Sequence, residues 1–170
     1  KTAKGTNIVN ILQVEQGEKV QAMVHTRSLE DDGRFLFMVT RNGVVKRLPA
    51  GSLKNLRNNG IRALTMTEDD RLITVRETDG EQNILIATHD GCAVCFPEEE
   101  VRPMGRTAVG VLGIKLREGD YVVGAARAQS GKAVLTITEK GYGKRTPVEE
   151  YRITKRNAYG IKNYMLTEKT

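Results

Sequence analysis

The chain contains one pattern three times: an apolar stretch, a tight turn with glycine, and a second stretch that ends in proline. The copies run from Phe35 to Pro49, from Asn83 to Pro97 and from Ala133 to Pro147, so successive copies begin 48 and 50 residues apart. A period of about 50 residues built from short strands is typical of radial or stacked β-architectures, in which each copy forms one small sheet. The repeat therefore predicts an all-β, propeller-like array.

Other positions keep the same period. Threonine precedes each turn and glycine occupies it, at Thr40 and Gly43, Thr88 and Gly91, and Thr138 and Gly141. A glycine followed by an aliphatic residue also recurs, at Gly60-Ile61, Gly110-Val111 and Gly160-Ile161. We expect 1–170 to be a single array of four-stranded antiparallel units, about three repeats and a partial one, with approximate limits 1–52, 53–101, 102–151 and 152–170.

Strand positions follow from the hydrophobic pattern. In the first repeat we expect strands over Ile8 to Val14, Lys19 to Arg27, Phe35 to Thr40 and Val44 to Leu48. The third strand of each repeat is apolar at nearly every position, which predicts a central strand buried on both faces: Phe35 to Val39, Ile84 to Ala87 and Val134 to Ile137. We expect the prolines at an outer edge or at the end of a strand. Helix is expected only as short 3₁₀ turns such as Pro147 to Tyr151.

Charge is distributed unevenly over the repeats. The chain has 27 Lys and Arg against 21 Asp and Glu, a net charge of +6. Basic residues gather on the fourth strands and on the connections that follow them, and the middle repeat opposes its own with Glu98, Glu99 and Glu100. A basic edge on a rigid array suits contact with the phosphates of duplex nucleic acid. The alternative is a solvated edge whose Lys and Arg block pairing with another chain.

Other classes of function find little support. Aromatic residues make up 5% of the chain and Trp is absent, so platforms for stacking single-stranded bases are few. No apolar run approaches the roughly 20 residues that a membrane helix needs. The two cysteines fit a reducing, cytoplasmic location. The chain begins and ends in mid-pattern, which we interpret as a piece of a longer protein.

Candidate catalytic and metal motifs are weak. His89, Cys92 and Cys95 form an H-x-x-C-x-x-C string, but strand residues three apart lie roughly 10 Å apart on opposite faces, so we expect no zinc site there. Gly131-Lys132 and Gly143-Lys144 lack the other residues of a P-loop. His25 has no nucleophile that the repeat places beside it. We expect no catalytic residue, metal or small-molecule substrate in this chain.

Two long stretches of the chain resemble a known family. The runs EEEVRPMGRTAVGVLGIKLREGDYVVGA (Glu98 to Ala125) and ITEKGYGKRTPVEEYR (Ile137 to Arg152) are similar to the C-terminal domain of bacterial DNA gyrase A. The resemblance implies a β-pinwheel of about six four-stranded blades with an outer strand exchanged between neighbours, of which this chain would supply about three. The glycine-rich wrapping motif of that family's first blade is absent, and Thr154 to Gly160 is a degenerate equivalent.

The resemblance also implies a function. In that family the basic perimeter binds and wraps duplex DNA without sequence specificity and so supports negative supercoiling by the holoenzyme, a type II topoisomerase composed of gyrase A and gyrase B. The ATP and Mg²⁺ sites and the catalytic tyrosine belong to other parts of that bacterial, nucleoid-associated enzyme. The DNA-binding residues expected from the charge pattern and the resemblance are Lys46, Arg47, Lys54, Arg57, Arg62, Arg102, Arg106, Lys144, Arg145, Arg152, Lys155, Arg156 and Lys162.

Two alternatives stay open. The similar C-terminal domain of topoisomerase IV would explain the same motifs, and a protein-interaction propeller would explain the repeats with an incidental basic rim. Cys95 occupies the repeat position of Arg47 and Arg145. If residue 95 faces outward, the change Cys95→Arg should restore one phosphate contact; if it faces inward, Arg should disrupt the blade.

Overall fold

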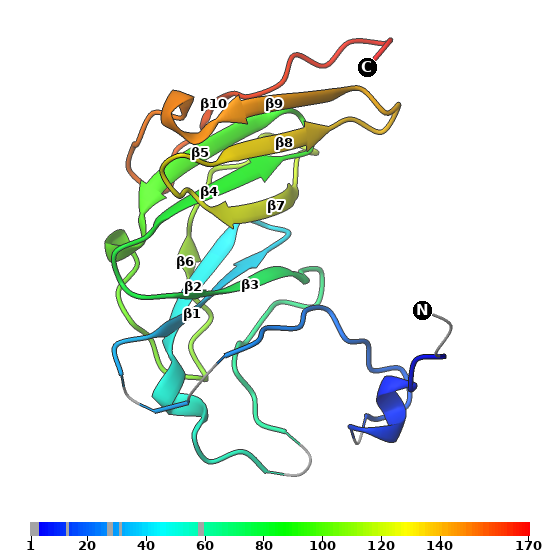
Figure 1. The fold of residues 1–170 in the computed structure, drawn as a ribbon, viewed down its shortest axis with the longest axis vertical. Helices are drawn as coiled ribbons and strands as arrows, with labels where there is room; N and C mark the ends of the chain where they lie inside the picture. The colour runs from blue at the N-terminus through cyan, green and yellow to red at the C-terminus, as the bar shows by residue number, and fades with distance from the viewer. Residues whose placement is uncertain (1–3, 13, 27–28, 31, 58–59) are drawn as a thin grey trace.

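The computed structural model describes residues 4–12, 14–26, 29–30, 32–57 and 60–170 (Figure 1). The strands are β1 (Phe35–Thr40), β2 (Val44–Pro49), β3 (Leu72–Thr78), β4 (Asn83–Thr88), β5 (Cys92–Pro97), β6 (Val111–Leu112), β7 (Val122–Arg127), β8 (Ala133–Ile137), β9 (Gly143–Pro147) and β10 (Ile161–Lys162). The 3₁₀ helices are η1 (Ile8–Asn10), η2 (Ala50–Leu53), η3 (Glu98–Glu100) and η4 (Val148–Glu150). Within the described residues no α-helix occurs, so the all-β prediction is confirmed.

The strands form three antiparallel sheets that follow one another along the long axis of the molecule (Figure 1). The first sheet has the order β3-β1-β2-β6, the second β10-β5-β4-β7, and the third contains β8 and β9. β6 follows the hairpin of the second sheet in sequence but pairs with β2 of the first, and β10 is passed back to β5 in the same way. The exchange of an outer strand between neighbouring blades, which the resemblance implied, is therefore confirmed.

Threonine and glycine recur in the hairpins because each closes the turn. In the first hairpin the Thr40 hydroxyl accepts a hydrogen bond of 3.1 Å from the Val44 N–H, and the same bond forms from Cys92 to Thr88 and from Tyr142 to Thr138. Gly43 has a φ of 80°, a conformation that costs glycine nothing and other residues a steric clash. The prolines end β2, β5 and β9 and lead directly into η2, η3 and η4.

The glycine before each exchanged strand has a different role. A Cβ at Gly110 would lie 2.5 Å from the carbonyl oxygen of Val45, so only glycine lets β6 approach β2 this closely. Gly160 faces the backbone of Ala93 in the same way where β10 joins β5. The periodic glycines therefore mark the points at which one blade is joined to the next.

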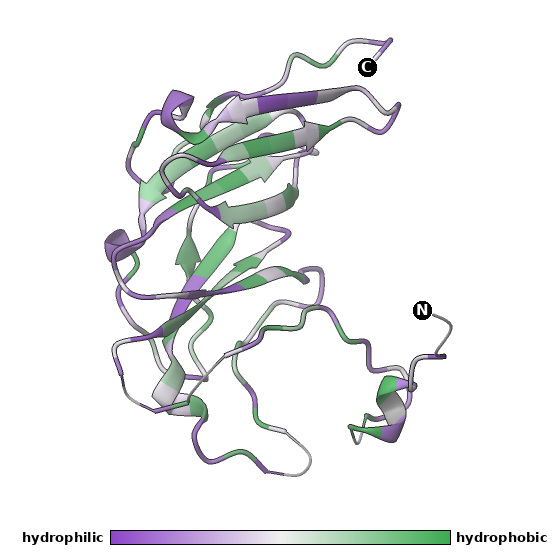
Figure 2. Cartoon of the chain, viewed as in Figure 1, coloured by the Kyte–Doolittle hydropathy of each residue, from purple (hydrophilic) through white to green (hydrophobic). Residues whose placement is uncertain are grey.

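The core lies between the sheets. Phe37 of the first sheet and Phe96 of the second meet with ring centroids 6.4 Å apart, inside a buried cluster that includes Val45, Ile86 and Val122. Between the second and third sheets the core is smaller and contains Leu85, Ala93, Cys95 and Tyr151. Figure 2 shows this as green strands in the middle of the array and more purple at the loops.

Several strand predictions were wrong. Ile8 to Asn10 is 3₁₀-helical and neither 11–12 nor 19–26 forms a strand, while Gln13 and Arg27 lie outside the described residues. Val134 to Ile137 lies in β8 but is not buried on both faces, because Leu135 and Ile137 are 64% and 63% exposed and no other sheet among the described residues covers them. The first and second sheets take strands from 35–112 and 83–162; the repeat limits given above stay a prediction.

Candidate nucleic-acid interface

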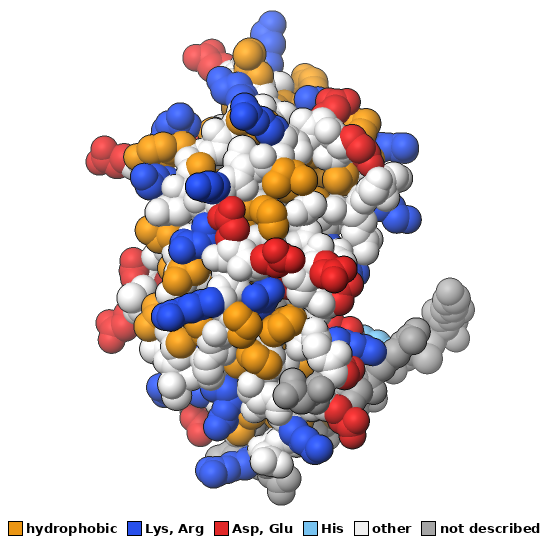
Figure 3. All heavy atoms as spheres, turned by 90° about the vertical axis from the view of Figure 1, so that its left-hand side faces the viewer, with side chains coloured by type: hydrophobic (Ala, Val, Ile, Leu, Met, Phe, Trp, Pro, Cys, Tyr) orange, Lys and Arg blue, Asp and Glu red, His pale blue; other side chains and the backbone are white. Residues whose placement is uncertain are grey.

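Three loops leave the sheets at equivalent places, and we call them the exit loops. They follow η2, η3 and η4 and comprise residues 54–62, 101–110 and 151–160, of which 58–59 lie outside the described residues. The three 3₁₀ helices lie on the left side in Figure 1. Figure 3 faces that side and shows Lys and Arg along its whole length, among hydrophobic side chains and with acidic ones near its middle. Repetition of the blade thus aligns basic loops along one face.

Most of the basic residues expected to bind DNA are exposed. In the three exit loops, Lys54, Arg102 and Arg152 each lie five residues after a strand-ending proline. The exposed residues are Lys54, Arg57, Arg62, Arg102, Arg106, Lys144, Arg145, Arg152, Lys155 and Lys162. Lys144 and Arg145 lie on β9, and Lys162 lies on the exchanged strand β10.

Lys46 is not on the surface, so the expectation of an exposed phosphate contact was wrong for it. Its side chain has no exposed area, and Nζ donates hydrogen bonds to the carbonyl oxygens of Ala63 (2.8 Å), Arg106 (2.7 Å) and Ala108 (2.9 Å). These three acceptors saturate the ammonium group. Burial lowers the pKa of Lys46 from its ordinary value. Lys46 therefore fastens the second exit loop, and the residue that directly follows the first exit loop, to the first sheet.

Arg47 is also buried, 7% exposed, which again contradicts its expected place on the rim. Its guanidinium lies over the Phe35 ring, 4.6 Å from the centroid, and Nη1 is 3.8 Å from Oε2 of Glu98. Glu98 is fully buried and accepts hydrogen bonds from the Thr78 hydroxyl (2.6 Å) and the Gly80 N–H (3.0 Å). Arg47 thus belongs to a polar connection between the first two sheets.

Arg156 is half-buried and holds the third exit loop against η3 and β6, the two elements that flank the second exit loop. Its Nη1 donates to the carbonyl oxygen of Leu112 (3.0 Å), its Nε to that of Glu100 (3.1 Å), and its backbone N–H to Oε2 of Glu100 (2.8 Å). With two guanidinium nitrogens bound to backbone, Arg156 is a positioning residue for Arg152 and Lys155 in the same loop.

The acidic residues of the middle repeat are mostly engaged inside the fold. Glu98 is buried beside Arg47, Glu100 is bound to Arg156, and of the three only Glu99 is exposed. The expectation that all three oppose the charge of Arg102 and Arg106 at the surface was therefore wrong.

Cys95 faces inward, which decides between the two orientations that the sequence left open for residue 95. It is 3% exposed and packs with Leu85, Ala93 and Tyr151. Burial raises the pKa of its thiol. The side chains of β5 alternate between the two sheets that flank it, and residue 95 lies on the face toward the third sheet.

Sequence reasoning missed a cationic group around an exposed aromatic ring. Tyr159 is 51% exposed, and Nζ of Lys115 and Cζ of Arg117 lie 5.8 and 5.6 Å from its ring centroid. Both cations are exposed and follow the exchanged strand β6. The alternation in Lys115-Leu116-Arg117, with both cations on one face, was the signal that could have found them.

Comparisons with known proteins agree with this architecture. The family model described as DNA gyrase C-terminal domain, beta-propeller, matches residues 34–79, 82–129 and 132–169. DNA gyrase A of Staphylococcus aureus is 46% identical over 169 residues, which are 98% of this chain and 19% of that protein. The chain therefore spans about a fifth of the length of such relatives.

Two solved structures share the fold. The C-terminal domain of DNA topoisomerase IV superposes with a TM-score of 0.84 at 30% identity, over 92% of this chain and 49% of that one. A DNA gyrase A C-terminal domain superposes with a TM-score of 0.83 at 25% identity, over 94% and 53%. With three successive matches to the family model and this shared blade architecture, the chain belongs to the family of the DNA gyrase C-terminal domain.

Proposed function

We propose that this chain binds duplex DNA without sequence preference, through the exit loops and the basic residues of β9 and β10. The observation that carries the proposal is the recurrence of exposed Lys and Arg at the same place after each strand-ending proline, on one face of a rigid array. Phosphate charges recur along a duplex, so a repeated spacing of cations can neutralise several of them at once. Lys115 and Arg117 join this surface as additional cations.

The proposed partner is a duplex rather than a single strand. Within the described residues only 3₁₀ turns and strands occur, so no α-helix is offered to a major groove, and side chains that could stack on unpaired bases are few. Contact with phosphates positions a protein on DNA without reading its sequence. The absence of sequence preference follows from that kind of contact.

The wider role follows from the relatives and extends the proposal. The chain matches the C-terminal domain of gyrase A, which is part of a type II topoisomerase. We propose that this domain wraps DNA beside the rest of gyrase A and together with gyrase B, and thereby supports negative supercoiling in the bacterial cytoplasm. Among the described residues no helix is long and apolar enough to cross a membrane.

Two observations bear on the alternative functions, a topoisomerase IV domain and a protein-interaction domain. The topoisomerase IV domain superposes as well as the gyrase domain does, with TM-scores of 0.84 and 0.83, so the same loops could serve that enzyme. The exposed Leu135 and Ile137 on β8 offer an apolar face to a protein partner. In the first two sheets the equivalent residues Phe37 and Leu85 are covered by the next sheet, which is the simpler reason for an apolar face here.

Duplex binding measured against salt tests the proposal. Contact with about six phosphates should give a log–log slope of affinity against salt of about −5. Two duplexes of equal length and unrelated sequence should bind alike. A slope near zero, or a strong preference for one sequence, would overturn the proposal and favour a protein-interaction role.

A further inference from the structure

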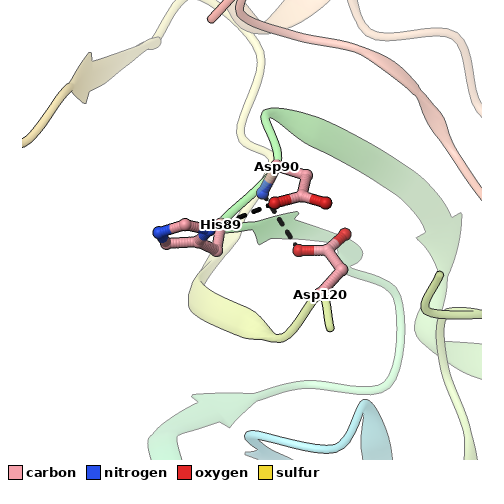
Figure 4. A group of neighbouring side chains, drawn as sticks. All are labelled: His89, Asp90 and Asp120. Carbon is pink, nitrogen blue, oxygen red and sulfur yellow. Dashed lines mark hydrogen bonds and ion pairs between the residues drawn. The ribbon is translucent and has the colours of Figure 1, made fainter. Parts of the chain in front are cut away.

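Three side chains with metal-ligating atoms meet at the hairpin end of the second sheet. His89 and Asp90 lie in the turn between β4 and β5, and Asp120 lies just before β7 (Figure 4). One ligand atom from each falls within 4.8 Å of the other two, and Nδ1 of His89 is 3.1 Å from Oδ1 of Asp90. His89 and Asp90 are 39% and 48% exposed, so an ion from solution can reach them.

The first sheet supplies an internal comparison for this corner. There Asp70 accepts a hydrogen bond of 2.9 Å from the Asn42 N–H, as Asp120 accepts one of 3.0 Å from the Asp90 N–H. The aspartate that closes the hairpin is therefore shared by both sheets and has a structural role. The second sheet differs in the turn itself, where His89 and Asp90 stand in place of Arg41 and Asn42. In the first sheet the second carboxylate near this corner, Asp69, accepts a hydrogen bond of 3.2 Å from the Asn42 side-chain amide, whereas in the second sheet the turn itself supplies an imidazole and a carboxylate.

The surroundings of His89 point to a metal as well. Oε1 of Glu139, in the turn of the third sheet, lies 3.6 Å from Nε2, on the side of the ring away from Asp90. A metal-bound histidine usually directs its second ring nitrogen to a carboxylate, which fixes its tautomer and strengthens it as a ligand. The ring also stacks on Tyr121, with centroids 4.6 Å apart and planes 24° apart, which holds its plane.

The local charge favours a dication. Three carboxylates, those of Asp90, Asp120 and Glu139, surround an imidazole that is neutral when it binds metal. Two cations lie nearby: the Arg41 guanidinium stacks 3.9 Å from the Tyr121 centroid, and Lys140, which lines the same hollow as His89 and Glu139, donates a hydrogen bond from its Nζ to the carbonyl oxygen of Glu168. Two adjacent carboxylates without a full set of cations are electrostatically unfavourable, and an ion between them relieves the repulsion.

We propose that His89 Nδ1 and the carboxylates of Asp90 and Asp120 bind a first-row transition-metal dication, with Glu139 orienting the imidazole. Ligand atoms about 2.1 Å from a tetrahedral ion lie about 3.4 Å apart, so His89 and Asp90 already have the needed separation. Oδ1 of Asp120 keeps the Asp90 and Tyr121 N–H groups, so Asp120 would reach the ion with its other carboxylate oxygen after a small shift. One nitrogen and two oxygens suit Mn²⁺ or Zn²⁺ better than Mg²⁺, which prefers oxygen alone. The ion would hold the hairpin ends of the second and third sheets together.

Paramagnetic NMR with Mn²⁺ tests the site directly, because the chain has only two histidines. On titration of the 170-residue chain with Mn²⁺, the imidazole resonances of His89 should broaden at substoichiometric ion, while those of His25 stay sharp. Broadening falls steeply with distance from the ion, so His25 is a control within the same sample. Equal broadening of both histidines would mean non-specific binding and would overturn the proposal.

The change Asp90→Asn gives a matched variant, since Asn42 occupies that place in the first sheet with the same backbone bond. It should unfold at the same temperature as the parent without metal, yet need at least about tenfold more Mn²⁺ to broaden His89. Glu139→Gln should weaken binding by about tenfold through the orientation of the ring. Zn²⁺ should displace Mn²⁺ and restore the His89 signal, whereas Mg²⁺ at the same concentration should not. Unchanged broadening in Asp90→Asn would overturn the proposal.

Discussion

The buried ammonium group of Lys46 donates a hydrogen bond of 2.7 Å to the carbonyl oxygen of Arg106, whose own side chain is exposed. One residue that the charge pattern assigned to the DNA-binding edge therefore anchors the loop that carries another. Lys46 is bound a second time to that loop, at Ala108, and once to Ala63, which directly follows the first exit loop. The position of the exposed Arg106 in the second exit loop therefore depends on the buried ammonium group of Lys46.

The change Lys46→Met tests this role. It keeps the aliphatic stem but leaves three buried carbonyl oxygens without their donor, and we expect a loss of about 3 kcal/mol in the free energy of unfolding. In a chain of this size that corresponds to a fall of about 6–12 °C in melting temperature. Lys144→Met, at the same repeat position but exposed on β9, should change the melting temperature little. Equal effects of the two changes would contradict the anchoring role.

Charge removal in the exit loops should weaken DNA binding without loss of stability. Arg102→Ala with Arg106→Ala, and Arg152→Ala with Lys155→Ala, should each reduce the salt slope by up to about two units, one for each phosphate that is no longer neutralised. The two pairs should act alike, because Glu98 and Glu100 are engaged inside the fold and leave Glu99 as the exposed acid of that turn. Duplex affinity measured at two salt concentrations gives the slope for each variant. A slope unchanged in both variants would mean that DNA binds a surface other than the exit loops.

Leu85 and Leu135 occupy the same repeat position in different surroundings. Leu85 is 2% exposed between the second and third sheets, whereas Leu135 is 64% exposed. We therefore expect Leu85→Ala to lower the free energy of unfolding by about 2–4 kcal/mol and Leu135→Ala by less than about 0.5 kcal/mol. Chemical denaturation of the two variants measures both. A comparable loss for Leu135→Ala would show that its face is covered in solution.

Much of the fold could be predicted from the repeat because its signals act locally. Threonine and glycine specify the hairpins, proline ends the strands, and the Gly110 and Gly160 positions mark where the exchanged strands approach their neighbours. The repeat alone could not predict the pairing partners, since β6 joins a sheet whose other strands lie upstream of β4 and β5; the exchange of strands was expected only from the family resemblance. Periodicity shows that a strand exists but not which sheet receives it.

The inward orientation of Lys46 and Arg47 was beyond sequence reasoning for a related reason. Adjacent basic residues on a strand point to opposite faces, and one of them is normally expected in solvent. Here both faces are covered by distant segments: carbonyl oxygens of 63, 106 and 108 on one side, Phe35 and Glu98 on the other. Only the tertiary structure brings these partners together.

Cys95 should make stability depend on pH. Burial raises the pKa of its thiol, so in the unfolded chain the thiol ionises at lower pH than in the folded one. The contribution of the buried thiol to the free energy of unfolding is fully present below the unfolded-state pKa of about 8.5. It falls as the pH rises above that value, by at most about 1.4 kcal/mol per pH unit. Unfolding of the parent and of Cys95→Val, compared between about pH 7 and 10, isolates this contribution from other groups. Parallel curves would contradict it.

The change Cys95→Arg should destabilise the second sheet rather than add a DNA contact. A hollow of about 490 Å³ beside Cys95 is lined by Asn83 and Val148, which occupy the repeat positions of Phe35 and Glu98. In the first sheet Phe35 stacks on Arg47 and Glu98 pairs with it, so a new Arg at 95 would have room but neither of these partners. Glu149 also lines the hollow, but its carboxylate already accepts hydrogen bonds from Ser130 and the Gly131 N–H. A poorly paired buried cation should cost about 2–3 kcal/mol of the free energy of unfolding.

Adding Val148→Glu to Cys95→Arg should return at least about half of that loss, because it supplies the carboxylate that Arg47 finds in Glu98. Val148→Glu alone should be neutral or destabilising, so any recovered stability in the double variant must come from the interaction between Arg at 95 and Glu at 148. Melting temperatures of the two single variants and the double variant form the cycle that separates the pair from its parts. Duplex affinity of the folded double variant should equal that of the parent, because the new carboxylate at 148 neutralises the new guanidinium at 95. Tighter DNA binding by either Arg-containing variant would instead place residue 95 within reach of phosphate.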